Sequence, residues 1–194
     1  TAAEMAKIDL FAPHSQKSLD DLHARAKHLF ETTDYAIMYS GLGSIHEHCQ
    51  GLRGWDQWMM DLAGDPDLAC TLMDKLADAN IQAAAQVLPA IEGYAQVVVI
   101  GGDLGMQDGP QMSPDTYRKL IKPRAKRFYD FIRSHTSAKL FIHTCGSVYA
   151  LLPDLIEAGI EVLNPVQVAA RDMDTAKLKR EFGKDIAFWG GGCD

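Results

Sequence analysis

The sequence has few cysteines, a shortage of basic residues and no long hydrophobic run, and each of these excludes a class of protein. Its 194 residues include four scattered cysteines, Cys49, Cys70, Cys145 and Cys193. So few and so widely spaced thiols argue against a secreted disulfide scaffold and favour reduced thiols in the cytosol. We therefore expect a cytoplasmic protein.

Acidic side chains outnumber basic ones. The chain has 19 lysines and arginines against 26 aspartates and glutamates, a formal charge of −7, whereas nucleic-acid binders normally carry a basic patch. No run approaches the roughly 18 apolar residues that a membrane span requires. We expect neither a nucleic-acid partner nor a membrane. The 47% share of hydrophobic residues instead indicates a folded, globular chain.

The length suits a single domain, because domains commonly hold about 100–200 residues. Thr1 opens directly in helix-like sequence without an initiator methionine, and Asp194 comes shortly after a run of three glycines. We expect residues 1–194 to form one domain that is a piece of a longer protein.

Hydrophobic periodicity predicts strands that alternate with helices. Five short runs rich in β-forming residues are nearly continuous in apolar side chains, as expected for parallel strands buried on both faces. The stretches between them are amphipathic and long enough for crossover helices. The predicted strands are Tyr35–Ser40, Gln96–Gly101, Lys139–His143, Ile160–Asn164 and Ile186–Gly190.

The predicted helices begin at recognisable caps. Asp65-Pro66 and Ser113-Pro114 each place a capping side chain before a proline at the first helical position. Pro89 and Pro123 should bend or end the helices in which they lie. We expect helices over Ser18–Thr32, Ser44–Leu62, Asp65–Ile91, Ser113–Ser134, Val148–Ala158 and Thr175–Phe182.

Repeated β-α units allow either a doubly wound open sheet or a (β/α)8 barrel. Glycine-rich or polar residues follow every predicted strand at its C-terminal end, from Gly41-Leu42-Gly43 to Gly191-Gly192-Cys193-Asp194. A barrel gathers its chemistry at that end. We therefore expect an α/β fold of the (β/α)8 TIM-barrel type, present as an incomplete segment of about five β/α units.

His143 and Cys145 are the strongest candidates for chemistry. Residues two apart at the end of a strand point the same way, and imidazole and thiolate together bind zinc. Cys193 follows the last predicted strand and could supply a third ligand, with Asp194 or a later residue completing the set. A His, Cys, Cys set with an exchangeable position is typical of catalytic zinc. The alternative is that the cysteines only pack beside a strand.

Polar residues follow other strands at the same end. Asp103 lies among glycines, so its carboxylate could orient a polar substrate, hold a pyrrole N–H or act as an acid or base; the alternative is a turn that closes its own loop. His46 and His48 lie two apart in a predicted helix, on different faces, and we assign them no role. Three neutral amides suit either substrate positioning or the capping of backbone groups: Gln107, Asn164 and Gln167.

Several motifs occur in an order that resembles the uroporphyrinogen decarboxylase superfamily. The resemblance spans roughly residues 18–194. It implies a (β/α)8 barrel in which the five strands are the third to the seventh, with strands one, two and eight outside the sequence. The motifs are Gly102-Asp103-Leu104-Gly105 with Gln107, Ser113-Pro114, Tyr117-Arg118, Lys122-Pro123, His143-x-Cys145-Gly146-Ser147, Leu163-Asn164-Pro165-Val166-Gln167, Leu178-Lys179, Phe182-Gly183 and Trp189-Gly190-Gly191.

Two chemistries are known in this superfamily. The methyltransferase branch transfers a methyl group between a corrinoid protein and a thiol, and it uses zinc held by an H-x-C pair, to which His143 and Cys145 correspond, and by a later cysteine. In that branch the later cysteine belongs to the last strand, beyond Cys193, so the third ligand is either Cys193 or a residue outside the sequence. Two segments depart from the decarboxylase pattern and favour the methyltransferase branch: Gly41–His46 and His143-Thr144-Cys145-Gly146.

The resemblance predicts a zinc-dependent methyltransferase that uses a small thiol and a methyl-corrinoid on a partner protein, with Asp103 and Gln107 at the substrate. Two alternatives stay open: a cofactor-free decarboxylase of a tetrapyrrole carboxylate, and a non-catalytic partner that binds a corrinoid or tetrapyrrole. A homodimer is one expected assembly. A barrel without three of its strands would expose sheet edges and apolar core, so we expect the segment to depend on a longer chain or a partner chain.

Overall fold

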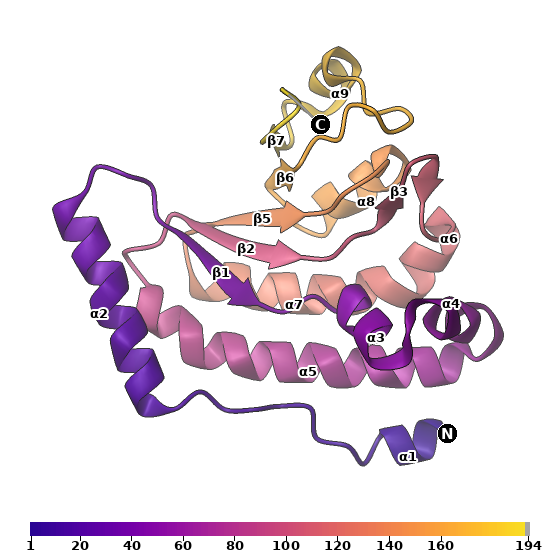
Figure 1. The fold of residues 1–194 in the computed structure, drawn as a ribbon, viewed down its shortest axis with the longest axis horizontal. Helices are drawn as coiled ribbons and strands as arrows, with labels where there is room; N and C mark the ends of the chain where they lie inside the picture. Colours follow the sequence, from indigo (N-terminus) through magenta and orange to yellow (C-terminus); the bar gives the residue numbers. More distant parts are fainter. Residues whose placement is uncertain (193–194) are drawn as a thin grey trace.

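In a computed structural model, which describes residues 1–192, a five-stranded parallel sheet forms the centre of the chain (Figure 1). Its strands lie in the order β1-β2-β5-β6-β7, and every pairing is parallel. The five predicted strands are confirmed, but only Lys139–His143 has the predicted bounds. The first is shifted to Met38–Leu42, and the second, fourth and fifth are shorter than predicted. The strands are β1 (Met38–Leu42), β2 (Val97–Gly101), β5 (Lys139–His143), β6 (Val162–Asn164) and β7 (Ala187–Phe188).

The strand order decides between the two architectures. Spatial order equals chain order, so each strand is added on the same side of the one before it. A doubly wound sheet would reverse direction at a switch point, and the strands within residues 1–192 show no reversal. Because parallel crossovers are right-handed, successive units of this kind place their helices on one face of the sheet. This is the winding of a (β/α)8 barrel, and residues 1–192 contain five of its strands with the four helical crossovers that join them.

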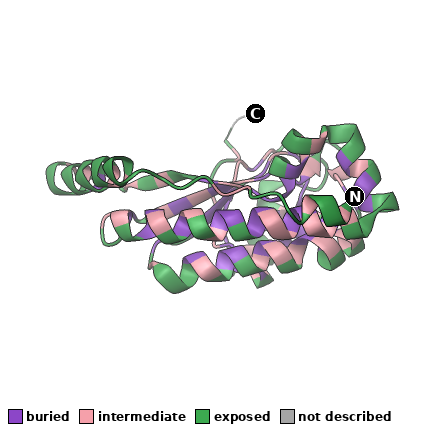
Figure 2. Ribbon diagram, turned by 90° about the horizontal axis from the view of Figure 1, so that it is seen from below, coloured by how far each residue is buried: buried purple, intermediate pink, exposed green. Residues whose placement is uncertain are grey.

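Helices fill the connections, and α5 and α7 lie side by side along the sheet (Figure 1). Helix α2 extends away from this body, and most of its surface is exposed (Figure 2). The helices are α1 (Ala2–Met5), α2 (Gln16–Thr32), α3 (His46–Arg53), α4 (Trp55–Gly64), α5 (Pro66–Ile91), α6 (Pro114–Thr116), a π-helical turn (Tyr117–Ile121), α7 (Lys122–His135), a 3-10 turn (Tyr149–Leu151), α8 (Leu152–Glu157) and α9 (Thr175–Phe182).

The predicted caps form, but one predicted helix is wrong in extent. The side chain of Asp65 accepts a hydrogen bond from Leu68 N–H, and that of Ser113 accepts one from Thr116 N–H. The stretch 44–62 divides into α3 and α4 at Gly54, whose φ of 79° lies in the left-handed region and ends the first helix. The chain widens into its π-helical turn just before Pro123, because proline lacks the N–H that a regular helix needs.

One face of the sheet is buried against helices, and the other is more open. Val98 and Ile100 on β2, like Leu140 and Ile142 on β5, have at most 1% of their surface exposed. The alternate residues of β2 are only partly buried, and the last residue of β5, His143, is exposed. The helix-covered face therefore holds the core, and the open face carries the polar strand ends.

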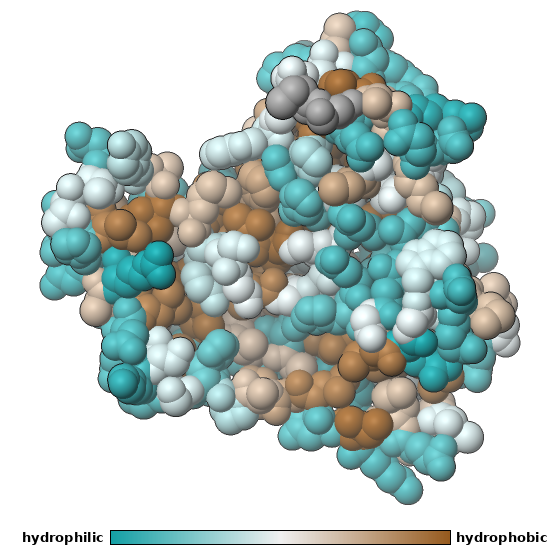
Figure 3. Space-filling view, viewed as in Figure 1, coloured by the Kyte–Doolittle hydropathy of each residue, from teal (hydrophilic) through white to brown (hydrophobic). Residues whose placement is uncertain are grey.

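Apolar residues also reach the surface near the first strand. The large exposed apolar side chains include Phe30 on α2, Tyr35 in the segment between α2 and β1, and Met38 on β1. Figure 3 shows apolar surface beside α2 and over the sheet. This exposure is expected for a barrel-type sheet that does not close within residues 1–192. A short antiparallel hairpin, β3 (Gly105–Met106) with β4 (Gly109–Pro110), follows β2 and was not predicted. No helix of the described chain has the length and apolar character to cross a bilayer.

Candidate functional site

The C-terminal ends of three strands bring their last residues into one row. Gly101, His143 and Asn164 are register partners across β2, β5 and β6, so they face the same side of the sheet. Gly101 has no side chain, which leaves space beside His143. The loops that follow these strands carry the other candidate residues, so the row forms the centre of the site.

Asp103, His143 and Cys145 converge above this row. One ligand atom from each lies within 4.8 Å of the other two, and Cys145 Sγ is 3.6 Å from His143 Nε2. His143 is exposed, whereas Asp103 and Cys145 are partly buried. The cluster thus combines a soft donor (the Cys145 sulfur), a borderline donor (the His143 imidazole) and a hard donor (the Asp103 carboxylate). Because His143 is exposed, a ligand can reach the cluster from solvent.

Asn164 orients the His143 ring through the imidazole nitrogen that faces away from Cys145. His143 Nδ1 lies 2.7 Å from Asn164 Oδ1, and because an amide oxygen only accepts, the imidazole donates from Nδ1. This bond fixes the tautomer whose lone pair is on Nε2, the nitrogen that faces Cys145. Asn164 is itself held, because its Nδ2 donates to the carbonyl of Trp189 at 2.9 Å. The amide therefore orients the imidazole instead of projecting into the open mouth.

Two more candidate side chains fix the backbone of the Cys145 loop. Asp103 Oδ1 accepts a hydrogen bond from Cys145 N–H at 2.8 Å, and Gln167 Oε1 accepts one from Gly146 N–H at 2.7 Å. Gln107 lies next to Gln167, with 3.4 Å between Gln107 Oε1 and Gln167 Nε2. Gln107 Nε2 also donates to the carbonyl of Ala169 at 2.6 Å. Asp103, Gln107 and Gln167 thus all bond to backbone groups, and the two glutamines lie beside the loop that follows β6.

Glycines allow the Asp103 and Cys145 loops to touch backbone to backbone. A Cβ atom at Gly105 would lie 2.5 Å from the carbonyl oxygen of Cys145, and one at Gly146 would lie 2.5 Å from the carbonyl carbon of Gly105. Gly146 also has a φ of 79°, which favours glycine. No larger residue fits at either position without separating the loops, so both glycines hold the cluster together.

The donor set fits zinc. Zinc bonds of about 2.0–2.1 Å to nitrogen and about 2.3 Å to sulfur, meeting at a tetrahedral angle, separate the two donor atoms by about 3.6 Å. The Sγ–Nε2 separation between Cys145 and His143 is 3.6 Å, and Asp103 places a carboxylate in the same cluster. Cys193 and Asp194, considered above as further ligands, lie outside the described residues.

The pKa of the Cys145 thiol is raised above its ordinary value. Desolvation is the largest cause, and the negative charges of Asp103 and Glu47 act in the same direction. The neutral thiol is therefore favoured unless a nearby cation offsets these charges. Without a metal ion, the raised pKa makes Cys145 a weaker nucleophile at neutral pH than an ordinary cysteine.

Two residues near the cluster were missed from the sequence. Glu47 Oε2 lies 3.5 Å from the position that a Cβ atom would take at Gly101, in the space beside His143. Gln111 Nε2 donates a hydrogen bond to the carbonyl of Asp103 at 3.1 Å. Both reach the site through space from other elements, and no spacing pattern in the sequence indicates either.

His46, to which we assigned no role, is buried behind the Asp103 loop. Trp58 Nε1 donates to His46 Nδ1 at 3.0 Å, which leaves the Nε2–H of His46 to donate to Gln111 Oε1 at 3.1 Å. Burial lowers the pKa of His46. Because Gln111 in turn donates to the Asp103 carbonyl, this neutral histidine supports the loop that carries the carboxylate.

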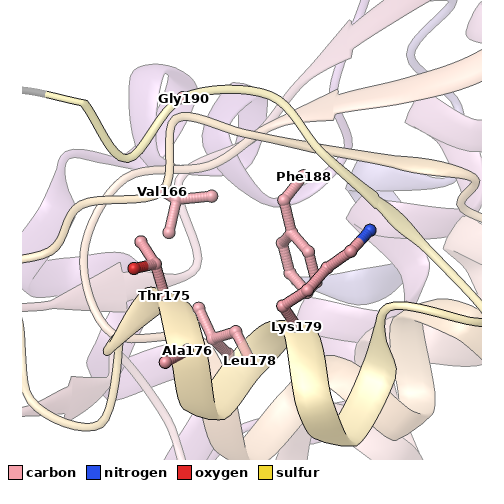
Figure 4. A pocket seen from close by; sticks show the side chains of 7 residues that line it. All are labelled: Val166, Thr175, Ala176, Leu178, Lys179, Phe188 and Gly190. Atoms are coloured by element: carbon pink, nitrogen blue, oxygen red, sulfur yellow. The ribbon is translucent and has the colours of Figure 1, made fainter.

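Two hollows near the strand ends differ in their relation to the cluster. A cleft of about 620 Å³ reaches Gly101 in the row of strand ends. A hollow of about 340 Å³ lies between α9 and the ends of β6 and β7, with Val166, Leu178 and Phe188 in its walls (Figure 4). None of the three cluster residues lines either hollow, and of the two only the cleft reaches the row of strand ends, at Gly101.

Comparisons with known proteins find methyltransferases among the relatives of this chain. Two curated relatives are methylcobamide:CoM methyltransferases MtaA of Methanosarcina barkeri. One is 31% identical over 113 residues, which are 58% of this chain and 31% of that protein. The other, from strain Fusaro, is 30% identical over 94 residues, 48% of this chain and 26% of that protein. The chain thus spans between a quarter and a third of the length of these relatives.

A solved methyltransferase from Methanosarcina mazei superposes with a TM-score of 0.57 at 26% identity, over 73% of this chain and 40% of that one. Residues 43–190 match the family model of uroporphyrinogen decarboxylase. This match covers most of the chain and includes every strand of the five-stranded sheet except β1. The chain belongs to the uroporphyrinogen decarboxylase family.

Proposed function

We propose that the chain is part of a zinc-dependent methyltransferase that transfers a methyl group between a corrinoid on a partner protein and a small thiol. The observation that carries this proposal is the 3.6 Å approach of His143 Nε2 and Cys145 Sγ beside the carboxylate of Asp103. The resemblance to methyltransferases in sequence and in fold supports it.

His143 and Cys145 would hold the zinc ion, with a third protein ligand from Cys193 or from a residue further along the chain. Zinc bound by such ligands lowers the pKa of a coordinated thiol and makes it nucleophilic at neutral pH. Asn164 keeps the Nε2 lone pair of His143 directed at the site. The Asn164 contact thus fixes the direction of the His143 donor nitrogen before a substrate binds.

Asp103 is the proposed acceptor of the proton that the thiol substrate must lose. Its carboxylate lies within 4.8 Å of both proposed donor atoms, and one of its oxygens is anchored by Cys145 N–H. Gln107 and Gln167, beside the loop that follows β6, are the proposed substrate contacts, because neutral amides read a ligand by hydrogen-bond direction instead of charge.

Metal analysis of the full-length protein tests the proposal. We expect about one equivalent of zinc, which should be lost in Cys145→Ala and in His143→Ala. The control is Cys70→Ala, which removes a free thiol on α5 outside the cluster and should retain the zinc. Methyl transfer from methylcobalamin to a thiol should follow the zinc content. Less than about a tenth of an equivalent, unchanged by Cys145→Ala, would reject the proposal. Release of carbon dioxide from a porphyrinogen, insensitive to a chelator, would favour a decarboxylase instead.

A further inference from the structure

Trp189 directly follows β7 and precedes three consecutive glycines, and it has no part in the proposed chemistry. Its N–H donates to the carbonyl of Leu163, and its carbonyl accepts from Asn164 Nδ2, both at 2.9 Å. The residue before it, Phe188, is the register partner of Leu163. Trp189 is therefore level with Asn164, and it extends the row of strand ends to a fourth strand.

The side chain of Trp189 lies on the same face of the sheet as His143. Alternate residues of a strand share a face, so Phe141 and His143 on β5 point the same way. The indole ring contacts the Phe141 ring, with 5.7 Å between the ring centroids and 74° between the ring planes. Phe141 lies about 6.6 Å from His143 along the strand. Trp189 thus reaches back across β6 to the part of β5 that carries the proposed metal ligand.

The two rings form an aromatic wall on the open face of the sheet. Phe141 has only 4% of its surface exposed, although within residues 1–192 it does not belong to the core that the helices cover. Trp189 has 52% of its surface exposed, so the indole offers a flat apolar surface beside a polar cluster. In a (β/α)8 barrel this face lines the interior. Apolar surface of this kind favours contact with the carbon atoms of a ligand over contact with water.

We propose that Trp189 is a substrate-binding residue and that the carbon chain of a short aliphatic thiol packs against its indole ring. The inference rests on the proposed function, because it assumes that the thiol sulfur lies at the cluster of His143 and Cys145. The methyl donor is carried by a partner protein and can approach this sulfur only from the rim of the barrel, so the carbon chain must point away from the rim. In that direction Phe141 and Trp189 provide apolar surface.

Binding of two thiols to the zinc-loaded full-length protein tests the proposal: 2-mercaptoethanesulfonate and 2-mercaptoethanol. They share a two-carbon chain and differ at its end. In Trp189→Ala we expect the Kd of each, measured by calorimetry, to rise about tenfold, because two methylene groups lose an apolar contact. Trp189→Phe keeps an aromatic ring beside Phe141 and should stay within about threefold of the wild type.

Two further measurements separate substrate contact from a structural role. With methylcobalamin as donor, the KM for the thiol should rise in Trp189→Ala while kcat changes little, because bound and reacting thiol make the same contact. Zinc content should stay at the wild-type level, because alanine keeps the backbone carbonyl that holds Asn164. Thiol binding should also change the intrinsic fluorescence of the wild type, and this change should be absent in Trp189→Phe.

Trp55→Ala is the matched control. Trp55 lies on α4, outside the row of strand ends, and is 46% exposed, so this variant should keep the wild-type Kd and the fluorescence change. Wild-type Kd values in Trp189→Ala, or loss of its zinc, would overturn the proposal. An effect on only one thiol would do the same, since the indole would then contact the end group instead of the chain.

Failure of the proposed function gives a different result. Thiol binding that depends on Trp189, without any methyl transfer, would reject the methyltransferase and keep the assignment of Trp189. Methyl transfer with unchanged Kd values in Trp189→Ala would do the reverse.

Discussion

Asn164 Oδ1 lies 2.7 Å from His143 Nδ1, and this contact decides which imidazole nitrogen faces Cys145. The two residues are direct register partners on adjacent parallel strands. The sheet itself therefore orients the proposed ligand, and no flexible loop is needed to do so. A histidine whose second nitrogen is held by a neighbour is typical of metal sites, where such a partner fixes the tautomer and the ring direction.

Loss of the Asn164 amide should therefore weaken metal binding. We expect Asn164→Ala to reduce zinc affinity about 10–100-fold, the usual effect of removing a partner that orients a ligand. Competition with a chromophoric chelator measures this affinity. Asn164→Asp keeps an oxygen for His143 Nδ1 and should retain most of it. Wild-type affinity in Asn164→Ala would show that the contact does not position the ligand.

The thiol of Cys145 should be unreactive in the metal-free protein. Desolvation, assisted by Asp103 and Glu47, raises its pKa, so the rate of alkylation by iodoacetamide should rise with pH to a midpoint above the ordinary value of about 8.5. Asp103→Asn and Glu47→Gln should each move the midpoint down, because each removes a negative charge. Mass spectrometry of the modified peptide over a pH series gives the profile. A midpoint below that of an ordinary cysteine would contradict the expectation.

Close approach of two loops makes Gly105 sensitive to substitution. In Gly105→Ala the new Cβ would lie 2.5 Å from the Cys145 carbonyl oxygen, so the loops must separate, and we expect a loss of more than about 1 kcal/mol in the free energy of unfolding. Zinc binding should fall as well. Gly51→Ala is the control, because Gly51 lies in α3 with nothing within 4 Å of its Cβ position; it should gain about 0.5–1 kcal/mol. Equal effects in urea unfolding would refute the steric explanation.

Local chemistry made much of the fold predictable. The capping side chains of Asp65 and Ser113 were identified before prolines, and apolar runs located all five strands of the sheet. The spacing of His143 and Cys145 predicts that they face one point, and their Nε2 and Sγ atoms lie 3.6 Å apart. Features of this kind depend on residues close in sequence, whose geometry a strand or helix fixes.

Contacts that depend on strand register or on packing between distant segments could not be predicted from the sequence. Glu47 reaches the space above Gly101 only because α3 folds over the end of β2, and Gln111 meets Asp103 only because the hairpin turns back. Asn164 faces His143 because β5 and β6 pair in one particular register. The break at Gly54 was missed because an isolated glycine is tolerated within many helices.

The buried histidine behind the Asp103 loop should make stability depend on pH. Burial lowers the pKa of His46, and Trp58 Nε1–H already occupies its Nδ1 acceptor, so the folded protein disfavours the imidazolium. The unfolded chain protonates this residue near the ordinary value of about 6.5. As the pH falls below about 6.5, the unfolded state takes up a proton that the folded state does not, and the free energy of unfolding decreases. At pH 7 and above this loss is absent.

Urea unfolding at pH 7.5 and pH 5.5 measures that loss. His46→Asn keeps an acceptor for Trp58 but cannot be protonated, so the difference between the two pH values should be smaller in the variant than in the wild type. Subtracting the variant from the wild type removes the contributions of the other histidines and carboxylates, which the two proteins share. The prediction fails if both proteins lose the same free energy of unfolding between pH 7.5 and pH 5.5, since His46 would then titrate alike in the folded and unfolded states and the network to Gln111 would not depend on its neutral form.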